Sequence, residues 1–309
     1  MTCAISINTF REAVRQPVFW AIAIGTAVLM ILSCIFAGFA LGEESRLVRD
    51  AGLTSITIAG LLLAIFLSSS VISDEIEKKT ALTVLCKPVR RSQFVLGKYL
   101  GILLAVLVSS LILTAVLFVT VWIYESQVNY SVLFRAYWSS EILHPARLQK
   151  LGGGMADHSY AGKPLVLAAL FACLRADLSS FAFTVFPNLA KGVFLSFCEV
   201  GILASAAVAA STRVSMILNV CLTFSLFVIG HQGVFFLNII SGHAKTGSFI
   251  FTVASRVLPN LEFLNHASDI AFDKVIPMSL MGQLALYSVG WVAVFLLIAS
   301  ILFERRELA

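Results

Sequence analysis

The chain has 309 residues, of which 59% are hydrophobic and 13% are charged, and its formal net charge is +5. Soluble domains carry about 45 to 50% apolar and about 25% charged residues, so this composition excludes a water-soluble globular protein. Because helices that face lipid need apolar surface on every side, the composition predicts an all-α polytopic membrane protein.

Residues 5–16 predict an amphipathic helix that lies on the inner surface of the membrane. The apolar residues that recur at helical spacing are Ile7, Phe10, Ala13 and Val14, with polar and charged residues between them. Pro17 fits the end of this helix, because its ring opposes continued helix on its N-terminal side. A frayed polar tail is the alternative interpretation.

Six segments are long and apolar enough to cross a hydrocarbon core about 30 Å thick, which takes roughly 20 residues at about 1.5 Å rise each. These predicted spans are residues 18–41, 51–72, 99–123, 189–210, 215–240 and 283–303. The fourth begins with Lys191 and carries Glu199, but its later half is unbroken apolar and small residues. It is therefore counted as spanning.

The distribution of Lys and Arg predicts that both termini lie in the cytoplasm. With six spans, the segments on the cytoplasmic side hold eleven positive charges. The segments on the other side hold ten, but over roughly twice the length and mostly in loops too long to count fully. The expected location is the cytoplasmic (inner) membrane, with membrane lipid around the spans. The positive net charge follows from this bias and gives no reason to expect a nucleic acid partner.

The predicted cytoplasmic loop between the second and third spans, residues 73–98, is dense in both charge signs. An apolar run interrupts it, formed by Ala81, Leu82, Val84 and Leu85 and ended by Pro88. This pattern predicts a short helix below the membrane with one apolar face available to a partner. The alternative is an ordinary positively charged loop whose apolar run lies on the membrane surface.

A long external segment, residues 124–188, separates the third and fourth spans. Its apolar part, residues 165–187, holds Arg175 and Asp177 at the centre, where each charge would cost about 2.5 to 3.5 kcal/mol in a crossing helix. An interfacial or re-entrant helix is therefore predicted there.

Glu199 is the one acidic residue deep in a predicted span. It lies about 15 Å into that span, near the midplane, where a carboxylate without a partner is costly. A role in lining the path or a gate and a structural hydrogen bond between helices are both open. The same helix carries Gly201, Ser205 and Ala209 at four-residue spacing, which predicts close packing inside the bundle or at a subunit seam. His231, toward the outer end of its span, is predicted to have a packing role.

No motif for ATP binding or catalysis is found in the sequence. The phosphate-binding pattern G-x-x-x-x-G-K is absent, because neither Gly97-Lys98 nor Gly162-Lys163 has a glycine at the required spacing. The six cysteines are scattered without metal-ligand spacing, so no metal site is predicted and no residue is assigned a catalytic role. A secondary transporter, using Glu199 for ion coupling, and a membrane-embedded hydrolase remain alternatives, the second supported only by residues such as Ser225 and His231.

The 73–98 loop resembles that of the type-2 ABC-transporter permeases. The matching residues are Glu77, Lys78, Lys79, Thr80, Leu82, Leu85, Pro88, Arg90, Arg91, Phe94, Gly97 and Lys98. The predicted N-terminal amphipathic helix, six spans and internal termini agree with that family, whereas the external segment of about 65 residues is longer than its usual counterpart.

The resemblance implies that residues 1–309 form one transmembrane permease domain of an ATP-driven exporter. A cytoplasmic ABC ATPase subunit would bind ATP and Mg²⁺, and this chain would bind no cofactor. The residues expected to couple to that ATPase are Glu77, Lys78, Thr80, Leu82, Leu85, Pro88 and Arg91. A second permease chain, identical or paralogous, would complete the path. The substrate is left open among drugs, lipids, peptides and glycans.

Overall fold

The computed structural model describes residues 2–37, 43–70, 91–138, 185–241, 258–272 and 274–304, and the regular structure within these ranges is helical. The helices are α1 (Thr2–Arg15), α2 (Pro17–Ala37), α3 (Glu44–Ser68), α6 (Arg91–Trp138), α9 (Phe186–Ser211), α10 (Met216–Ser241), α12 (Ala267–Ala271) and α13 (Met278–Glu304). The predicted all-helical, multi-pass class is confirmed.

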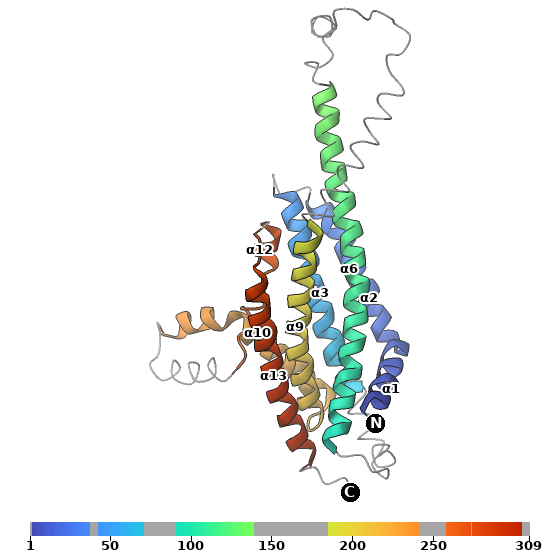
Figure 1. Cartoon of the computed structure of the whole chain (residues 1–309), viewed down its shortest axis with the longest axis vertical. Coiled ribbons are helices and arrows are strands. Elements are labelled where there is room, and N and C mark those ends of the chain that lie inside the picture. Colours follow the sequence, from blue (N-terminus) through green and yellow to red (C-terminus); the bar gives the residue numbers. More distant parts are fainter. Residues whose placement is uncertain are drawn as a thin grey trace, which may run out of the picture.

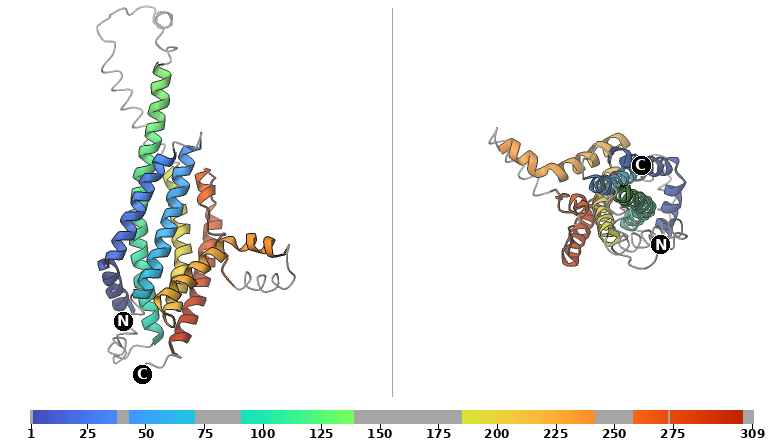
Figure 2. Two further views of the ribbon diagram at one scale, coloured as in Figure 1. Left: turned by 180° about the vertical axis from the view of Figure 1, so that it is seen from behind. Right: turned by 90° about the horizontal axis from the view of Figure 1, so that it is seen from above.

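Five of the described helices are long and apolar enough to cross a membrane: α2, α3, residues 92–125 of α6, α9 and α13. The shortest has 21 residues, which at about 1.5 Å rise per residue covers the hydrocarbon core. The predicted fifth span, residues 215–240, corresponds to α10, whose apolar part is the shorter stretch Met216–Gln232. Figures 1 and 2 show the last part of α10 leaving the bundle sideways.

The third predicted span, residues 99–123, is the middle of a much longer helix. α6 has 48 residues and continues beyond the bundle (Figure 1). The helix therefore extends past both ends of the predicted span, and the segment that follows the span begins as helix. The reason is local, because residues 124–138 contain neither proline nor glycine to end a helix.

The helix ends form two groups at opposite ends of the bundle (Figure 1). One group, here called the α1 end, holds α1, the end of α3, the beginnings of α6 and α10, and the ends of α9 and α13. The other, the α12 end, holds α12, the end of α2 and the beginnings of α3, α9 and α13. The described helix ends that flank the segments predicted to face the cytoplasm therefore lie at the α1 end.

α9 and α3 form the centre of the bundle, while α2 and α13 lie at its edge. Of the most apolar stretch of each helix, 78% is buried in α9 and 67% in α3, against 22% in α2 and 17% in α13. Small residues permit this close packing. A methyl group on Gly60 of α3 would lie only 2.8 Å from a methyl of Val200 on α9. The prediction that the span with Glu199, which is α9, packs closely inside the bundle is confirmed.

α1 packs against the beginning of α6. The residues of α1 that are buried against the protein are Ser6, Thr9 and Ala13. They face two glycines of α6. A Cβ on Gly101 would come within 2.5 Å of Cβ of Thr9, and Gly97 similarly faces α1. Of the apolar residues predicted to face the membrane, Ala13 is instead buried in the protein, because these glycines leave room for a helix at close range.

Candidate functional site

Glu199 and His231 meet at the contact between α9 and α10. Glu199 lies in the middle of α9 with 2% of its surface exposed. Nε2 of His231 lies 3.2 Å from Oε1 of Glu199, although this oxygen makes no well-aligned hydrogen bond. The structure thus brings together the two ionisable residues that the sequence placed in separate roles.

His231, for which a packing role was predicted, packs its ring against Phe227 and in addition makes a polar contact with Glu199. The sequence did not indicate the contact with Glu199, because α10 runs across the bundle at an angle and then leaves it (Figure 2). The general tendency of ionisable residues inside membranes to pair was the signal that could have indicated this contact.

The imidazole ring of His231 is fixed on its other side. Nδ1 lies 3.1 Å from the carbonyl oxygen of Phe227, one turn earlier in α10, and the two rings contact each other with centroids 4.5 Å apart. At the neighbouring Gly230, the backbone N–H of Leu261 donates a 3.1 Å hydrogen bond to the carbonyl. The histidine is therefore held in one orientation by its own helix and the segment before α12.

Apolar side chains surround this pair. The adjacent cluster is formed by the buried residues Leu61, Ile65, Ile202, Leu203, Leu261 and Leu264. On the α6 side of α9, the hydroxyl of Tyr99 donates a 3.3 Å hydrogen bond to the carbonyl of Gly201. A net charge at Glu199 would consequently be poorly solvated, and the arrangement favours a pair that is neutral overall.

Most of the predicted coupling residues lie outside the described part of the chain: Glu77, Lys78, Thr80, Leu82, Leu85 and Pro88. Arg91 is the first residue of α6. What the structure does show is how the helix ends on both sides of this loop are held.

The end of α3, which leads into the loop, is fixed by a buried polar network. Asn219 of α10 is completely buried, and its side-chain amide donates hydrogen bonds to the hydroxyls of Ser69 (2.8 Å) and Ser68 (3.2 Å). The hydroxyl of Thr223 donates to the Asn219 carbonyl oxygen at 3.2 Å. Ser70 donates to the side-chain oxygen of Gln16, between α1 and α2, at 3.0 Å. Sequence reasoning missed this network.

The beginning of α6, on the other side of the loop, rests on α1. Besides the glycine contacts, Nζ of the buried Lys98 lies 4.0 Å from a carboxylate oxygen of Glu12 and 5.7 Å from the ring centre of Phe94. Both ends of the loop are thus connected to the α1 region, one through Gln16 and the other through α1 itself.

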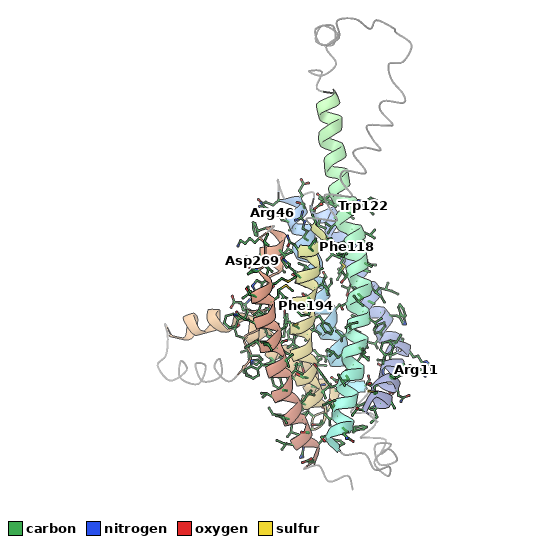
Figure 3. The ribbon with its side chains drawn as sticks, viewed as in Figure 1. Arg11, Arg46, Phe118, Trp122, Phe194 and Asp269 are labelled. Atoms are coloured by element: carbon green, nitrogen blue, oxygen red, sulfur yellow. The ribbon has the colours of Figure 1, made fainter. Side chains whose placement is uncertain are left out.

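A second polar cluster lies at the α12 end. The guanidinium of Arg49 on α3 forms an ion pair with Glu125 of α6, its Nε donating at 3.2 Å, and the hydroxyl of Tyr124 donates to Glu44 at 2.8 Å. Figure 3 shows Arg46 and Trp122 at this end and Arg11 near the other. These contacts join the outer parts of α3 and α6.

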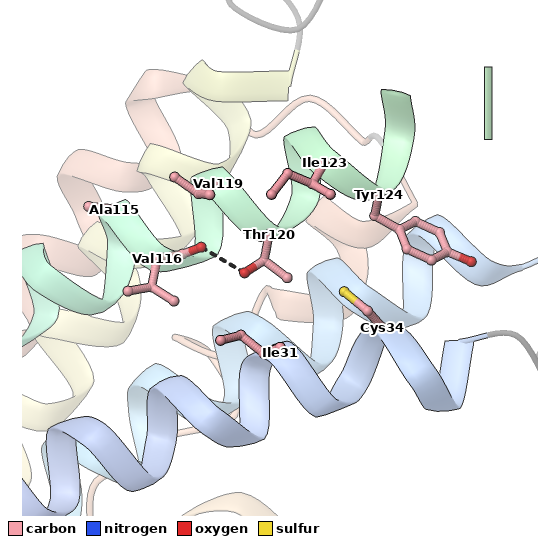
Figure 4. Close-up of a pocket in the computed structure, with 8 residues that line it drawn as sticks. All are labelled: Ile31, Cys34, Ala115, Val116, Val119, Thr120, Ile123 and Tyr124. Carbon is pink, nitrogen blue, oxygen red and sulfur yellow. Dashed lines mark hydrogen bonds between the residues drawn. The ribbon is translucent and has the colours of Figure 1, made fainter. Parts of the chain in front are cut away.

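A shallow apolar groove of about 550 Å³ lies between α2 and α6 (Figure 4). Its lining residues are Ile31, Cys34, Ala115, Val116, Val119, Thr120, Ile123 and Tyr124. The one hydroxyl in its middle, that of Thr120, donates to the carbonyl of Val116 at 2.8 Å. Glu199 does not line this groove. In the described residues no cluster of three His, Cys, Asp or Glu side chains could hold a metal ion.

A search of curated proteins finds no match to the chain. Residues 3–149 match the family model described as ABC-2 family transporter protein. The matched range includes α1, α2, α3, the 73–98 loop and α6. Residues 3–149 are therefore similar to this family, and the resemblance to the type-2 ABC-transporter permeases is confirmed.

Proposed function

We propose that this chain is the permease subunit of an ATP-driven ABC exporter, forming half of the translocation path and coupling to a separate cytoplasmic ATPase through residues 73–98. The observation that carries the proposal is the family match, which spans this loop and the helices on both sides of it. The sequence lacks a phosphate-binding loop, so ATP and Mg²⁺ would be bound by the partner.

The helix contacts at the α1 end support a coupling role for the loop. A movement of the loop would reach α10 through Ser69 and Asn219, and α1 through the packing at Gly97 and Gly101. Polar networks and closely packed small residues transmit displacement because they resist separation and compression. The loop is thus suited to pass motion of an ATPase into the bundle.

The proposed orientation puts the α1 end in the cytoplasm, with both termini there and α10 counted among the six spans. The excess of Lys and Arg near short connections supports this orientation. α10 would cross the membrane at an angle as part of a dimer with a second permease chain, which would supply the other half of the path.

The proposal is tested by measuring which energy source drives a conformational change of the bundle. The full chain would be reconstituted in nanodiscs with and without its partner ABC ATPase, with spin labels at Leu111 of α6 and Leu297 of α13, which are 59% and 63% exposed. We expect the distance between the labels to change when ATP and Mg²⁺ reach the complex, and to stay constant for the chain alone.

An ATPase without its catalytic carboxylate serves as the control. A distance change in proteoliposomes of the chain alone, driven by a proton gradient, would instead support a secondary transporter. A secondary transporter is kept as the second candidate because Glu199 and His231 form an ionisable pair within the bundle, and ion-coupled carriers use such pairs.

Glu199 is proposed to act in gating through α10, since it contacts that helix. Glu199→Gln keeps the shape of the side chain, so we expect normal assembly but an altered ATP-driven distance change. Glu199→Leu leaves His231 without this polar neighbour and should destabilise the fold by about 1 to 3 kcal/mol. If Glu199→Gln leaves the ATP-driven distance change unaltered while Glu199→Leu lowers the stability of the fold, the role of Glu199 is only structural. ATP hydrolysis, label distances and thermal unfolding of both variants decide between these roles.

A further inference from the structure

The hydrogen positions on His231 follow from its neighbours. Nδ1 faces the carbonyl oxygen of Phe227 at 3.1 Å. A carbonyl oxygen only accepts hydrogen bonds, so Nδ1 carries the hydrogen. In a neutral imidazole with hydrogen on Nδ1, the other nitrogen, Nε2, has none and presents a lone pair.

That lone pair lies 3.2 Å from Oε1 of Glu199. An ionised carboxylate also presents only lone pairs, so the two atoms repel each other unless a proton lies between them. The proton can belong to the carboxylic acid or to the imidazolium, and in both forms the pair is neutral overall. Without it the pair carries a negative charge at a residue with 2% of its surface exposed.

Other titratable groups near the pair do not replace this proton. On α9 itself Cys198 is the neighbouring residue, and α6 contributes Tyr99, whose hydroxyl donates to the carbonyl of Gly201. From the segment before α12, Glu262 acts electrostatically on His231 and adds negative charge. On α13, the hydroxyl of Tyr287 bonds to the backbone of Asn260. α3 contributes the apolar Leu61 and Ile65 to this region.

The position of the pair along α10 explains how the proton can hold this helix against the bundle. Near its beginning, α10 is attached to α3 by Asn219. The next polar attachment to a neighbouring spanning helix, among the described side chains, is His231, and the following residue, Gln232, is exposed. Beyond this point α10 departs from the bundle (Figures 1 and 2).

We propose that Glu199 and His231 together bind a single proton that fastens α10 to α9, and that loss of this proton to bulk water releases α10 from the bundle beyond Asn219. Acidic conditions keep the attachment closed, and alkaline conditions open it. This is a property of the chain alone, and it goes beyond the proposed ATP-driven transport because it requires no ATPase.

Spin-label distances across the α9–α10 contact test this proposal. The full chain, with its native cysteines replaced, would carry labels at Phe194 of α9 and Leu222 of α10, which are 43% and 52% exposed. It would be studied in nanodiscs over a pH series from about 5 to 10, which covers the range in which carboxyl and imidazole groups titrate in proteins. We expect a single short-distance population at low pH and a longer one at high pH.

Glu199→Gln should abolish this pH dependence and keep the short distance, because the amide can pair with either form of the imidazole and has no proton to lose. His231→Gln should behave in the same way, which provides a second test if the first variant does not insert. Labels at Ile58 of α3 and Phe194 form the control pair, whose distance should not change. A wild-type distance that is constant over the series, or a pH response that survives both substitutions, would overturn the proposal.

Discussion

Leu85→Asp is expected to release the cytoplasmic ATPase while the permease remains inserted and folded. Leu82 and Leu85 belong to the apolar run in the sequence of the 73–98 loop, which the resemblance assigns to ATPase coupling. Truncating a buried apolar anchor of an interface costs about 2 kcal/mol or more, and a charge in its place leaves a carboxylate in an apolar groove. At about 1.4 kcal/mol per tenfold change, the affinity should fall at least roughly 30-fold. Co-purification of a tagged ATPase measures this loss.

Two further variants separate a docking defect from damage to the bundle. Glu77→Gln changes a charge at the expected rim of the interface, so it should cost much less and mainly alter the salt dependence of binding. Leu53→Asp is the damaging control, because Leu53 is 1% exposed and packs against Gly192 of α9. If a stably inserted Leu85→Asp chain retains the ATPase fully, residues 73–98 are not the docking site.

The predicted spans agree with the helices where the requirement to cross lipid determines the apolar pattern of the sequence. The hydrocarbon core requires long apolar segments, so α2, α3, α9 and α13 could be found from composition and length. The part of α6 that extends beyond the bundle could not be found in this way, because apolar content indicates where a helix can enter lipid and says little about where the helix ends.

The contacts of the candidate site were harder to predict, since they depend on angles between helices. Glu199 was recognised because a carboxylate in an apolar segment is unusual. His231 was assigned a packing role because nothing in a linear sequence shows that α10 inclines toward α9. Asn219 and the serines at the end of α3 escaped notice for the same reason, although their buried hydrogen bonds fix the helix that leads into the loop.

The apolar pattern of α1 illustrates a related limit. Helical spacing identified a helix, which the structure places at Thr2–Arg15. The same spacing cannot distinguish a face that touches lipid from one that touches protein. Here Gly97 and Gly101, more than 80 residues later in the chain, make the difference, because they let Ile5 and Thr9 approach at close range.

Breaking the ion pair between Arg49 and Glu125 should produce the largest loss of stability among changes at the α12 end. The Arg49 side chain is only 9% exposed and that of Glu125 is 22% exposed. Removal of one partner from such a pair leaves a poorly solvated charge, which costs about 3 kcal/mol or more. Glu125→Leu should cost more than Arg49→Met, because a guanidinium stays charged at every accessible pH whereas a carboxylate can take up a proton.

The double variant, Arg49→Met with Glu125→Leu, should recover most of the lost stability, because two apolar side chains of similar size can replace a buried pair at little cost. The exposed pair Asp269–Lys274 is the matched control. Its Lys274 ammonium lies 2.7 Å from the carboxylate and lowers the pKa of Asp269, yet both side chains are at least 40% exposed. Lys274→Met should therefore cost less than about 1 kcal/mol. Thermal unfolding of the four variants in nanodiscs measures the coupling between Arg49 and Glu125. Equal, small losses at both pairs, or a double variant as unstable as the sum of its single changes, would show that the buried pair does not join α3 to α6.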